Sequence, residues 1–152
     1  MEIRDRSDAD LDGCVPLLRE VHDVAAYPVN WPADPRAWLT PADRLGAWVA
    51  DLDGRVVGHV VLTADGPAGA SVERLFVDPK ATRAGVGRAL LDHCVVTAAA
   101  LGRKLVLEVV DRPGSPAIAL YRRAGWQETG RTPIDWGGAE ASHLLHFTPP
   151  PD

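Results

Sequence analysis

The sequence predicts a single α/β (α+β) domain in which flanking helices cover a central, mixed and mostly antiparallel sheet. Two apolar runs joined by Asp53-Gly54 are typical of an antiparallel hairpin. A strand, a glycine-rich turn, a helix and a second strand then follow over residues 71–110. Such a connection favours a parallel pair of strands with a right-handed crossover. Two later segments, 126–131 and 142–147, predict strands that close the sheet.

Composition is that of a globular protein, with 46% hydrophobic and 24% charged residues among 152. We expect one domain over residues 1–148 and a flexible proline-rich tail over 149–152. The net charge of −5 disfavours general nucleic-acid binding. No run is long and apolar enough to span a membrane, and no basic-then-apolar signal segment opens the chain. These features predict a cytoplasmic protein without a membrane partner.

The cysteines and histidines give no sign of a metal site. The two cysteines, Cys14 and Cys94, both fall in predicted helices, and reduced thiols in the core are the expectation. The five histidines show no H-x-x-x-H spacing, and there is no C-x-x-C pair. We therefore expect no metal.

The chain opens with a predicted strand over residues 2–6, after which Ser7 is the expected helix N-cap. Pro16 lies inside the following helical pattern and is expected to kink or break it. The apolar positions of this pattern recur near helical spacing and form one face: Leu11, Cys14, Val15, Leu18 and Val21.

Residues 27–41 are rich in proline and tryptophan and predict a rigid loop with one short helix near 35–39. Its large aromatic side chains are Tyr27, Trp31 and Trp38. Large aromatics on such a loop either plug the core or line a pocket, and the pattern leaves both possibilities open.

The hairpin strands are predicted over 47–52 and 55–63, followed by a strand over 71–77. Gly58 inside the second strand indicates a bulge or a close backbone approach. His59 is expected to be an ordinary strand residue with its hydrogen bonds satisfied.

The segment 77–90 joins that strand to the N-terminus of a helix that ends at Gly102. A helix N-terminus offers unpaired N–H groups and the positive end of the helix dipole. Gly85 and Gly87 have no Cβ, so an anion can approach the main chain. Three basic residues add positive charge: Lys80, Arg83 and Arg88. The pattern predicts a diphosphate site, with an ordinary turn containing two glycines as the alternative.

After this helix, residues 104–110 form an apolar strand that only Glu108 interrupts. A short helix follows, for which Ser115 is the expected N-cap, Pro116 the first residue and Gly125 the end.

Two of these segments resemble the hallmarks of the GCN5-related N-acetyltransferase (GNAT) family. T-R-A-G-V-G at 82–87, after V-D-P, is similar to the family's acyl-CoA loop, Arg/Gln-x-x-Gly-x-Gly/Ala. A-I-A-L-Y-R-R-A-G-W at 117–126 resembles A-x-x-L-Y-x-x-x-G-F/W and comes one strand later, as in the family. The resemblance covers about residues 47–131 well, and the rest in outline.

The chain departs from the family pattern at three places. Thr82 stands where Arg or Gln is usual, and Arg83 beside it could supply the missing grip. Gly114 replaces a frequent Asn, and the linker after Glu108 is about one residue longer than usual.

The resemblance implies a GNAT-like fold in which a parallel pair of strands, Val72–Val77 and Lys104–Val110, splays apart. It implies acetyl-CoA as the cofactor, held in the gap and at the loop by a set of ten residues: Phe76, Val77, Thr82, Arg83, Ala84, Gly85, Val86, Gly87, Arg88 and Tyr121. The implied reaction is direct transfer of the acyl group to a primary amine, by an acetyl-CoA-dependent N-acetyltransferase.

Such chemistry needs an acid for the leaving thiolate and a base for the amine. Tyr121 is the expected acid, and a packing tyrosine is the alternative. Glu108 and Glu73 are the candidate bases, because buried carboxylates tend to have raised pKa values, although each could be a plain strand residue. The candidate acceptor contacts are Tyr27, Trp31, Trp38 and Asp135, with His143 a weaker candidate.

The acceptor is expected to be a small-molecule amine rather than a protein amine, by a narrow margin. A homodimer is a weak expectation from the family.

The sequence offers two alternative functions. One is a non-catalytic acyl-CoA-binding or sensor module, which would not need Tyr121. The other is a dinucleotide-binding Rossmann domain, which is disfavoured because Leu90 occupies the third glycine position.

Overall fold

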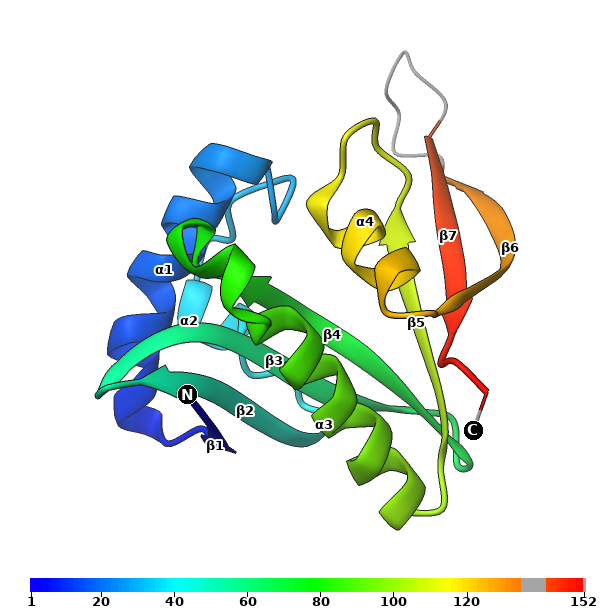
Figure 1. The fold of residues 1–152 in the computed structure, drawn as a ribbon, viewed down its shortest axis with the longest axis horizontal. Helices are drawn as coiled ribbons and strands as arrows, with labels where there is room; N and C mark the ends of the chain where they lie inside the picture. Colours follow the sequence, from blue (N-terminus) through cyan, green and yellow to red (C-terminus); the bar gives the residue numbers. More distant parts are fainter. Residues whose placement is uncertain (135–141, 152) are drawn as a thin grey trace.

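A computed structural model describes residues 1–134 and 142–151, apart from the side chains of Thr82 and Arg83. Within this part of the chain, seven strands form a sheet in the order β1-β2-β3-β4-β5-β7-β6 (Figure 1). Only β4 and β5 are parallel, and the other neighbours are antiparallel. The predicted fold class, a mixed and mostly antiparallel sheet with flanking helices, is confirmed.

The N-terminal part forms one edge of the sheet and a helical layer. Its elements are β1 (Glu2–Asp5), η1 (Asp8–Asp10), α1 (Leu11–Ala25) and α2 (Pro35–Trp38). Ser7 caps η1 rather than α1, and its N–H donates to the Asp10 carboxylate at 2.7 Å. Helix α1 continues through Pro16, so the break that the sequence left open does not occur.

The next three strands are β2 (Arg44–Leu52), β3 (Arg55–Asp65) and β4 (Gly69–Val77). The hairpin turn between β2 and β3 has φ +53° at Asp53 and +85° at Gly54, the left-handed pair that a tight two-residue turn requires. The predicted hairpin is therefore confirmed. Strands β2 and β4 begin earlier than expected, because backbone pairing with β3 extends beyond the apolar alternation.

The C-terminal half supplies the other face and the far edge of the sheet. Its elements are η2 (Pro79–Ala84), α3 (Val86–Ala100), β5 (Lys104–Val110), α4 (Pro116–Arg123), β6 (Gln127–Ile134) and β7 (Ser142–Thr148). The predicted cap of α4 is confirmed, since the Ser115 hydroxyl accepts a hydrogen bond from the Ile118 N–H at 3.2 Å.

Strands β4 and β5 pair only where they begin, Gly69–Ser71 against Lys104–Val106. Beyond these residues β4 is paired with β3 alone and β5 with β7 alone. Figure 1 shows the two strands diverging from this common start. The splayed parallel pair that the family resemblance implied is therefore present.

A bulge in β4 lies within this divergence. Facing pairs join His59 to Phe76 and Val61 to Glu73, so Arg74 and Leu75 together oppose one residue of β3. Arg74 has φ +55°, in the left-handed region. A bulge of this kind bends its strand and increases its twist, which turns β4 away from β5.

Two apolar clusters cover the two faces of the sheet. The larger one packs α3 and α4 against the sheet and includes Leu91, Cys94 and Leu107. The smaller one lies under α1 and includes Cys14 and Phe76. Both cysteines are free and buried, as predicted, and burial raises their pKa values to about 11 for Cys14 and about 12 for Cys94.

The close approach predicted at Gly58 is also confirmed. A Cβ added there would lie 2.7 Å from Val86 Cγ1 and 3.0 Å from Leu90 Cδ1. The glycine thus allows the first turns of α3 to sit directly on β3, which places the N-terminus of α3 at the mouth of the splayed strands.

Candidate functional site

The N-terminus of α3 presents a row of amides ahead of the first hydrogen bond within the helix. Gly85 ends η2 with φ +73°, and the first hydrogen bond of α3 runs from Ala89 N–H to Gly85 O at 3.0 Å. The N–H groups of Val86, Gly87 and Arg88 therefore precede the helical ladder and have no partner within the helix. Space around the Gly85 Cα is open, since an added Cβ would meet nothing within 4 Å. This geometry suits a phosphate group.

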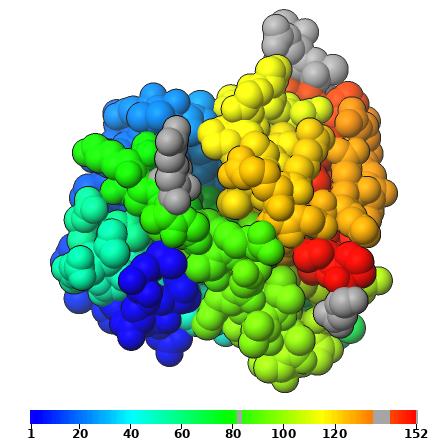
Figure 2. Space-filling model, viewed as in Figure 1, coloured from blue at the N-terminus to red at the C-terminus, as the bar shows by residue number. Residues whose placement is uncertain are grey.

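Gly87 has a second role that the sequence did not indicate. A Cβ at this position would lie 2.7 Å from Leu120 Cδ2 and 3.5 Å from Val77 Cγ2. The absence of a side chain thus brings α3 against α4 and the end of β4. The space-filling view shows the surfaces of α3 and α4 next to each other (Figure 2). One glycine therefore joins the two sequence motifs in space.

Three expected contacts of this region lie outside what the structure describes. Thr82 and Arg83 belong to η2 by their backbone, but their side chains are not among the described atoms. Asp135 lies outside the described residues altogether. Among the remaining loop residues, Ala84 and Arg88 are exposed, and Arg88 pairs with Asp92 at 3.4 Å.

The edge of β4 that faces the splayed gap offers the amide of Val77. Asp78 N–H donates to Val57 O at 2.8 Å, so Asp78 turns its amide towards β3. Because amides alternate along a strand, Val77 turns its N–H towards the gap and Phe76 turns its N–H towards β3. The Val77 amide therefore borders the gap, and its role in holding a cofactor stays a prediction. The Phe76 amide is on the β3 side, and its side chain is buried under α1.

Tyr121 lies on α4 with 6% of its surface exposed, against the rings of Phe147 and Trp126 at centroid distances of 5.7 and 6.4 Å. Burial raises the pKa of its phenol, and the nearby Tyr27 and Glu73 groups raise it further. The hydroxyl is therefore protonated at neutral pH, which leaves a proton available for donation.

The two candidate carboxylates stand on opposite sides of the gap, Glu73 on β4 and Glu108 on β5. Their strand neighbours Val72 and Leu107 pack in the cluster under α3, so both carboxylates point to the opposite face of the sheet. Burial raises the pKa of Glu73, and the charge of Glu108 adds to this effect, while Arg74 and the Ser71 hydroxyl oppose it. Glu73 is thus a carboxylate with increased basicity.

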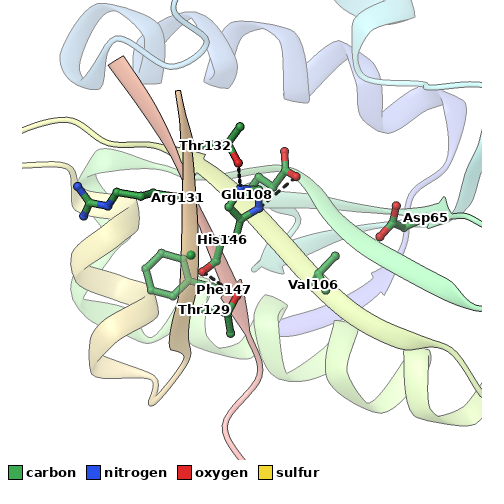
Figure 3. Close-up of a pocket in the computed structure, with 9 residues that line it drawn as sticks. Asp65, Val106, Glu108, Thr129, Arg131, Thr132, His146 and Phe147 are labelled. Carbon is green, nitrogen blue, oxygen red and sulfur yellow. Dashed lines mark hydrogen bonds and ion pairs between the residues drawn. The ribbon is translucent and has the colours of Figure 1, made fainter. Parts of the chain in front are cut away.

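Glu108 is more exposed, at 53% of its side chain, and belongs to a polar line on β5, β7 and β6. Its Oε1 lies 3.3 Å from His146 Nδ1, and His146 Nε2 lies 2.6 Å from Thr132 Oγ1 (Figure 3). These groups border a pocket of about 410 Å³ whose other lining includes both charged and apolar residues: Asp65, Val106, Thr129, Gly130, Arg131 and Phe147. The pocket opens on the sheet face to which Glu73 also points.

The three aromatic residues of the 27–41 segment separate into two places. Tyr27 and Trp38 meet edge to face at 5.9 Å, and the Arg74 guanidinium lies 4.0 Å above the Trp38 ring. Trp31 instead contacts His22 at 5.5 Å and Arg19 at 5.0 Å on α1. Tyr27 and Trp38 thus join β4 beside Glu73, whereas Trp31 packs on α1. All three also border the smaller apolar cluster.

Sequence reasoning missed several residues of this region. Arg74 carries the bulge and covers Trp38, and His146 holds Glu108. Neither belongs to a short motif, because each contact joins residues far apart in the chain. His59 has a partner at both ring nitrogens, as expected of a satisfied strand residue, but its contact with Arg6 was not predicted.

Two features are absent from residues 1–134 and 142–151. No group of three or more His, Cys, Asp or Glu side chains is placed to hold a metal ion. No helix of this part is long and apolar enough to cross a membrane.

Comparison with known proteins places these features in a wider group. The sequence profile of the Acetyltransferase (GNAT) family matches residues 15–126. Mycothiol acetyltransferase of Clavibacter sepedonicus is 40% identical over 92 residues, which are 60% of this chain and 29% of that protein. Human N-acetyltransferase 8 is 31% identical over 155 aligned residues, which cover 86% of this chain and 68% of that protein.

A peptidyl-lysine N-acetyltransferase of Salmonella typhimurium is 30% identical over 58% of this chain and 54% of its own length. The aligned part of the chain covers from 29% to 54% of the length of these two acetyltransferases and a third curated relative. Among solved structures, an aminoglycoside 6′-N-acetyltransferase complexed with coenzyme A superposes with a TM-score of 0.76 at 15% identity, over 100% of both chains.

Proposed function

The chain belongs to the acetyltransferase (GNAT) family, and on this premise we propose that it transfers an acetyl group from acetyl-CoA directly to a primary amine. The observation that carries the proposal is the splayed pair of β4 and β5. One end of the gap adjoins the free amides of α3, and Tyr121, Glu73 and Glu108 surround it. We treat residues 1–148 as one acetyltransferase domain.

The residues present fit coenzyme A. The N–H groups of Val86, Gly87 and Arg88 would hold the diphosphate, because Gly85 leaves the approach to them open. The Val77 amide would pair with the pantetheine arm along the unpaired edge of β4. When bound, the thioester supplies an activated acetyl group.

Tyr121 and the carboxylates divide the proton transfers between them. The Tyr121 hydroxyl is protonated, because burial raises the pKa of the phenol. It gives this proton to the departing sulfur. Glu73 accepts the proton of the incoming ammonium, because its raised pKa brings it closer to that of the amine. Glu108 is the alternative base, but its side chain is more exposed, at 53%, against 41% for Glu73.

The acceptor lies on the sheet face that carries the pocket, between Glu108 on one side and Tyr27 with Trp38 on the other. A small amine fits these aromatic and polar surroundings better than an extended peptide. Relatives are named for small-molecule and for peptidyl-lysine acceptors, which is consistent with either class. A homodimer and a cytoplasmic location remain expectations from the sequence.

The test combines binding with turnover. Acetyl-CoA, but not NAD, should raise the melting temperature, and a panel of primary amines should release CoA thiol. Tyr121→Phe should bind acetyl-CoA normally and lose about a hundredfold in kcat, the lower end of the range for general acid–base catalysis. Thermal protection without thiol release from any amine would instead identify an acyl-CoA sensor. Equal turnover by Tyr121→Phe would overturn the role of that residue.

A further inference from the structure

His59 is fully buried in β3, and both of its ring nitrogens have partners. Nε2 lies 2.8 Å from Arg6 Nη1, and Nδ1 lies 2.9 Å from the carbonyl oxygen of Arg74. A guanidinium has only donors, so Nε2 must accept from Arg6. The proton therefore sits on Nδ1 and is donated to the Arg74 carbonyl. The network selects one neutral tautomer of His59.

The Arg74 carbonyl belongs to the bulge of β4. The extra residue of a bulge is left without its regular ladder partner, and a buried carbonyl without a partner is unfavourable. The His59 ring provides a donor to this carbonyl. Its ring also stacks on Phe76 at a centroid distance of 4.9 Å and an interplanar angle of 21°. One side chain thus contacts β4 at the bulge and at the residue directly after it.

Arg6 orients His59 and connects it to the turn after α2. Nη1 of Arg6 also donates to Leu39 O, at 2.6 Å, and Nη2 donates to Thr40 Oγ1 at 2.9 Å. Arg74 reaches the same turn from the other side, because its Nε donates to Trp38 O at 3.0 Å. Two arginines therefore tie the bulge to residues 38–40, beside the aromatic side of the acceptor region.

We infer that His59, oriented by Arg6, is a positioning residue that holds the β4 bulge in register. The register decides which amides face the gap between β4 and β5. A slip of one residue would turn the Val77 N–H towards β3 and the Phe76 N–H towards the gap. The contacts of His59 with Arg6 and with the Arg74 carbonyl, called the lock below, therefore keep the Val77 amide where the pantetheine arm would pair with it. This inference rests on the proposed acetyltransferase function, but its structural part can be tested without turnover.

The variants separate the lock from general stability. His59→Leu removes both hydrogen bonds, whereas His59→Asn keeps a side-chain amide that can donate to the Arg74 carbonyl. Leu62→Ala is the matched control, because Leu62 is also fully buried in β3 but packs in the other cluster. Arg6→Met removes the donor to Nε2 and leaves His59 in place. Arg6→Met also tests the inference if the His59→Leu protein does not fold.

Two measurements need no acceptor. Nitrogen-15 NMR of the His59 ring should show the Nδ1–H tautomer in the wild type and a mixture in Arg6→Met. The Phe76 amide should exchange with solvent at least tenfold faster in His59→Leu than in Leu62→Ala. A wild-type ring with its proton on Nε2, or equal Phe76 exchange in these two variants, would overturn the inference.

Kinetics complete the test. His59→Leu should lower kcat at least tenfold relative to Leu62→Ala and should also weaken the binding of free coenzyme A, because the pantetheine arm would lose its pairing with the Val77 amide. His59→Asn should recover most of this loss. Equal kcat in His59→Leu and Leu62→Ala would refute the positioning role. If the wild type acetylates no amine, the proposed function fails, while the NMR and exchange measurements still decide whether the lock exists.

Discussion

Acid should destabilise this protein through His59. Burial lowers the pKa of His59 from its usual 6.5 to about 4, and the charges of Arg6 and Arg74 contribute, although the bond to the Arg74 carbonyl opposes the shift. Between these two pH values the unfolded chain binds a proton at His59 that the native chain does not bind. The free energy of unfolding must therefore decrease as the pH falls from 6.5 to 4.

The size of the effect follows from the shift. One pKa unit corresponds to about 1.4 kcal/mol, so the shift from 6.5 to about 4 is worth about 3 kcal/mol at pH 7. This stability is fully present above pH 6.5 and is lost as the pH falls towards 4. A loss of this size is a large part of the 5–15 kcal/mol, roughly, that holds a typical domain folded.

Urea unfolding followed by tryptophan fluorescence at pH 7, 6, 5 and 4.5 measures the effect. The comparison is with His59→Asn, whose side chain does not titrate. Other groups, such as Asp10 with its pKa lowered to about 2 by the Arg4 hydrogen bonds, are common to both proteins and cancel in the difference. The wild type should lose about 2 kcal/mol or more relative to His59→Asn over this range. Parallel pH profiles for the two proteins would refute a neutral, buried His59.

Three further results are expected. Gly85→Glu should abolish thermal protection by acetyl-CoA, because its charge and bulk would block the amides of α3. Gly66→Glu, at an equally open left-handed turn (φ +68°), should leave the protection intact. Loss of protection in both variants would point to a nonspecific effect. In the wild type, kcat/KM should fall at acidic pH with a midpoint above the usual pKa of a glutamate, because burial raises the pKa of Glu73. Glu73→Gln should remove this decrease, and Glu108→Gln should retain it. The reverse result would make Glu108 the base. Gly58→Ala should lower the free energy of unfolding by roughly 1–3 kcal/mol in urea titrations, because its Cβ would overlap α3 side chains, and an unchanged midpoint would contradict that packing.

Local elements of the fold were predictable because each depends on residues that are close in the chain. The Asp53-Gly54 turn needs two left-handed residues, and Ser115 with Pro116 needs only the first turn of α4 to act as a helix start. The order strand, glycine loop, helix and strand also determined that β4 and β5 are parallel. Errors concentrated at strand ends, such as β2 beginning at Arg44, where pairing with a neighbour decides the boundary.

The candidate site was predictable only in part. Two sequence motifs predicted Tyr121 and the amides of α3 as site groups. The burial of Tyr121 and the geometry of the α3 amides suit the expected roles. The pattern could not say that Glu73 has a raised pKa while Glu108 pairs with His146, because both differences come from neighbours on other strands. It also could not separate Trp31 on α1 from the pair beside β4.

The sequence by itself determined the turns, the caps and the two motifs in their order, which together identify the family and the expected cofactor site. Only the tertiary structure decided where β4 bulges, which amide faces the gap, and that His59 holds the bulge. The reason is that these features rest on contacts such as Arg6 with His59, which are 53 residues apart in the chain. No local pattern encodes such a pair, because its energy exists only once the sheet has brought its members together.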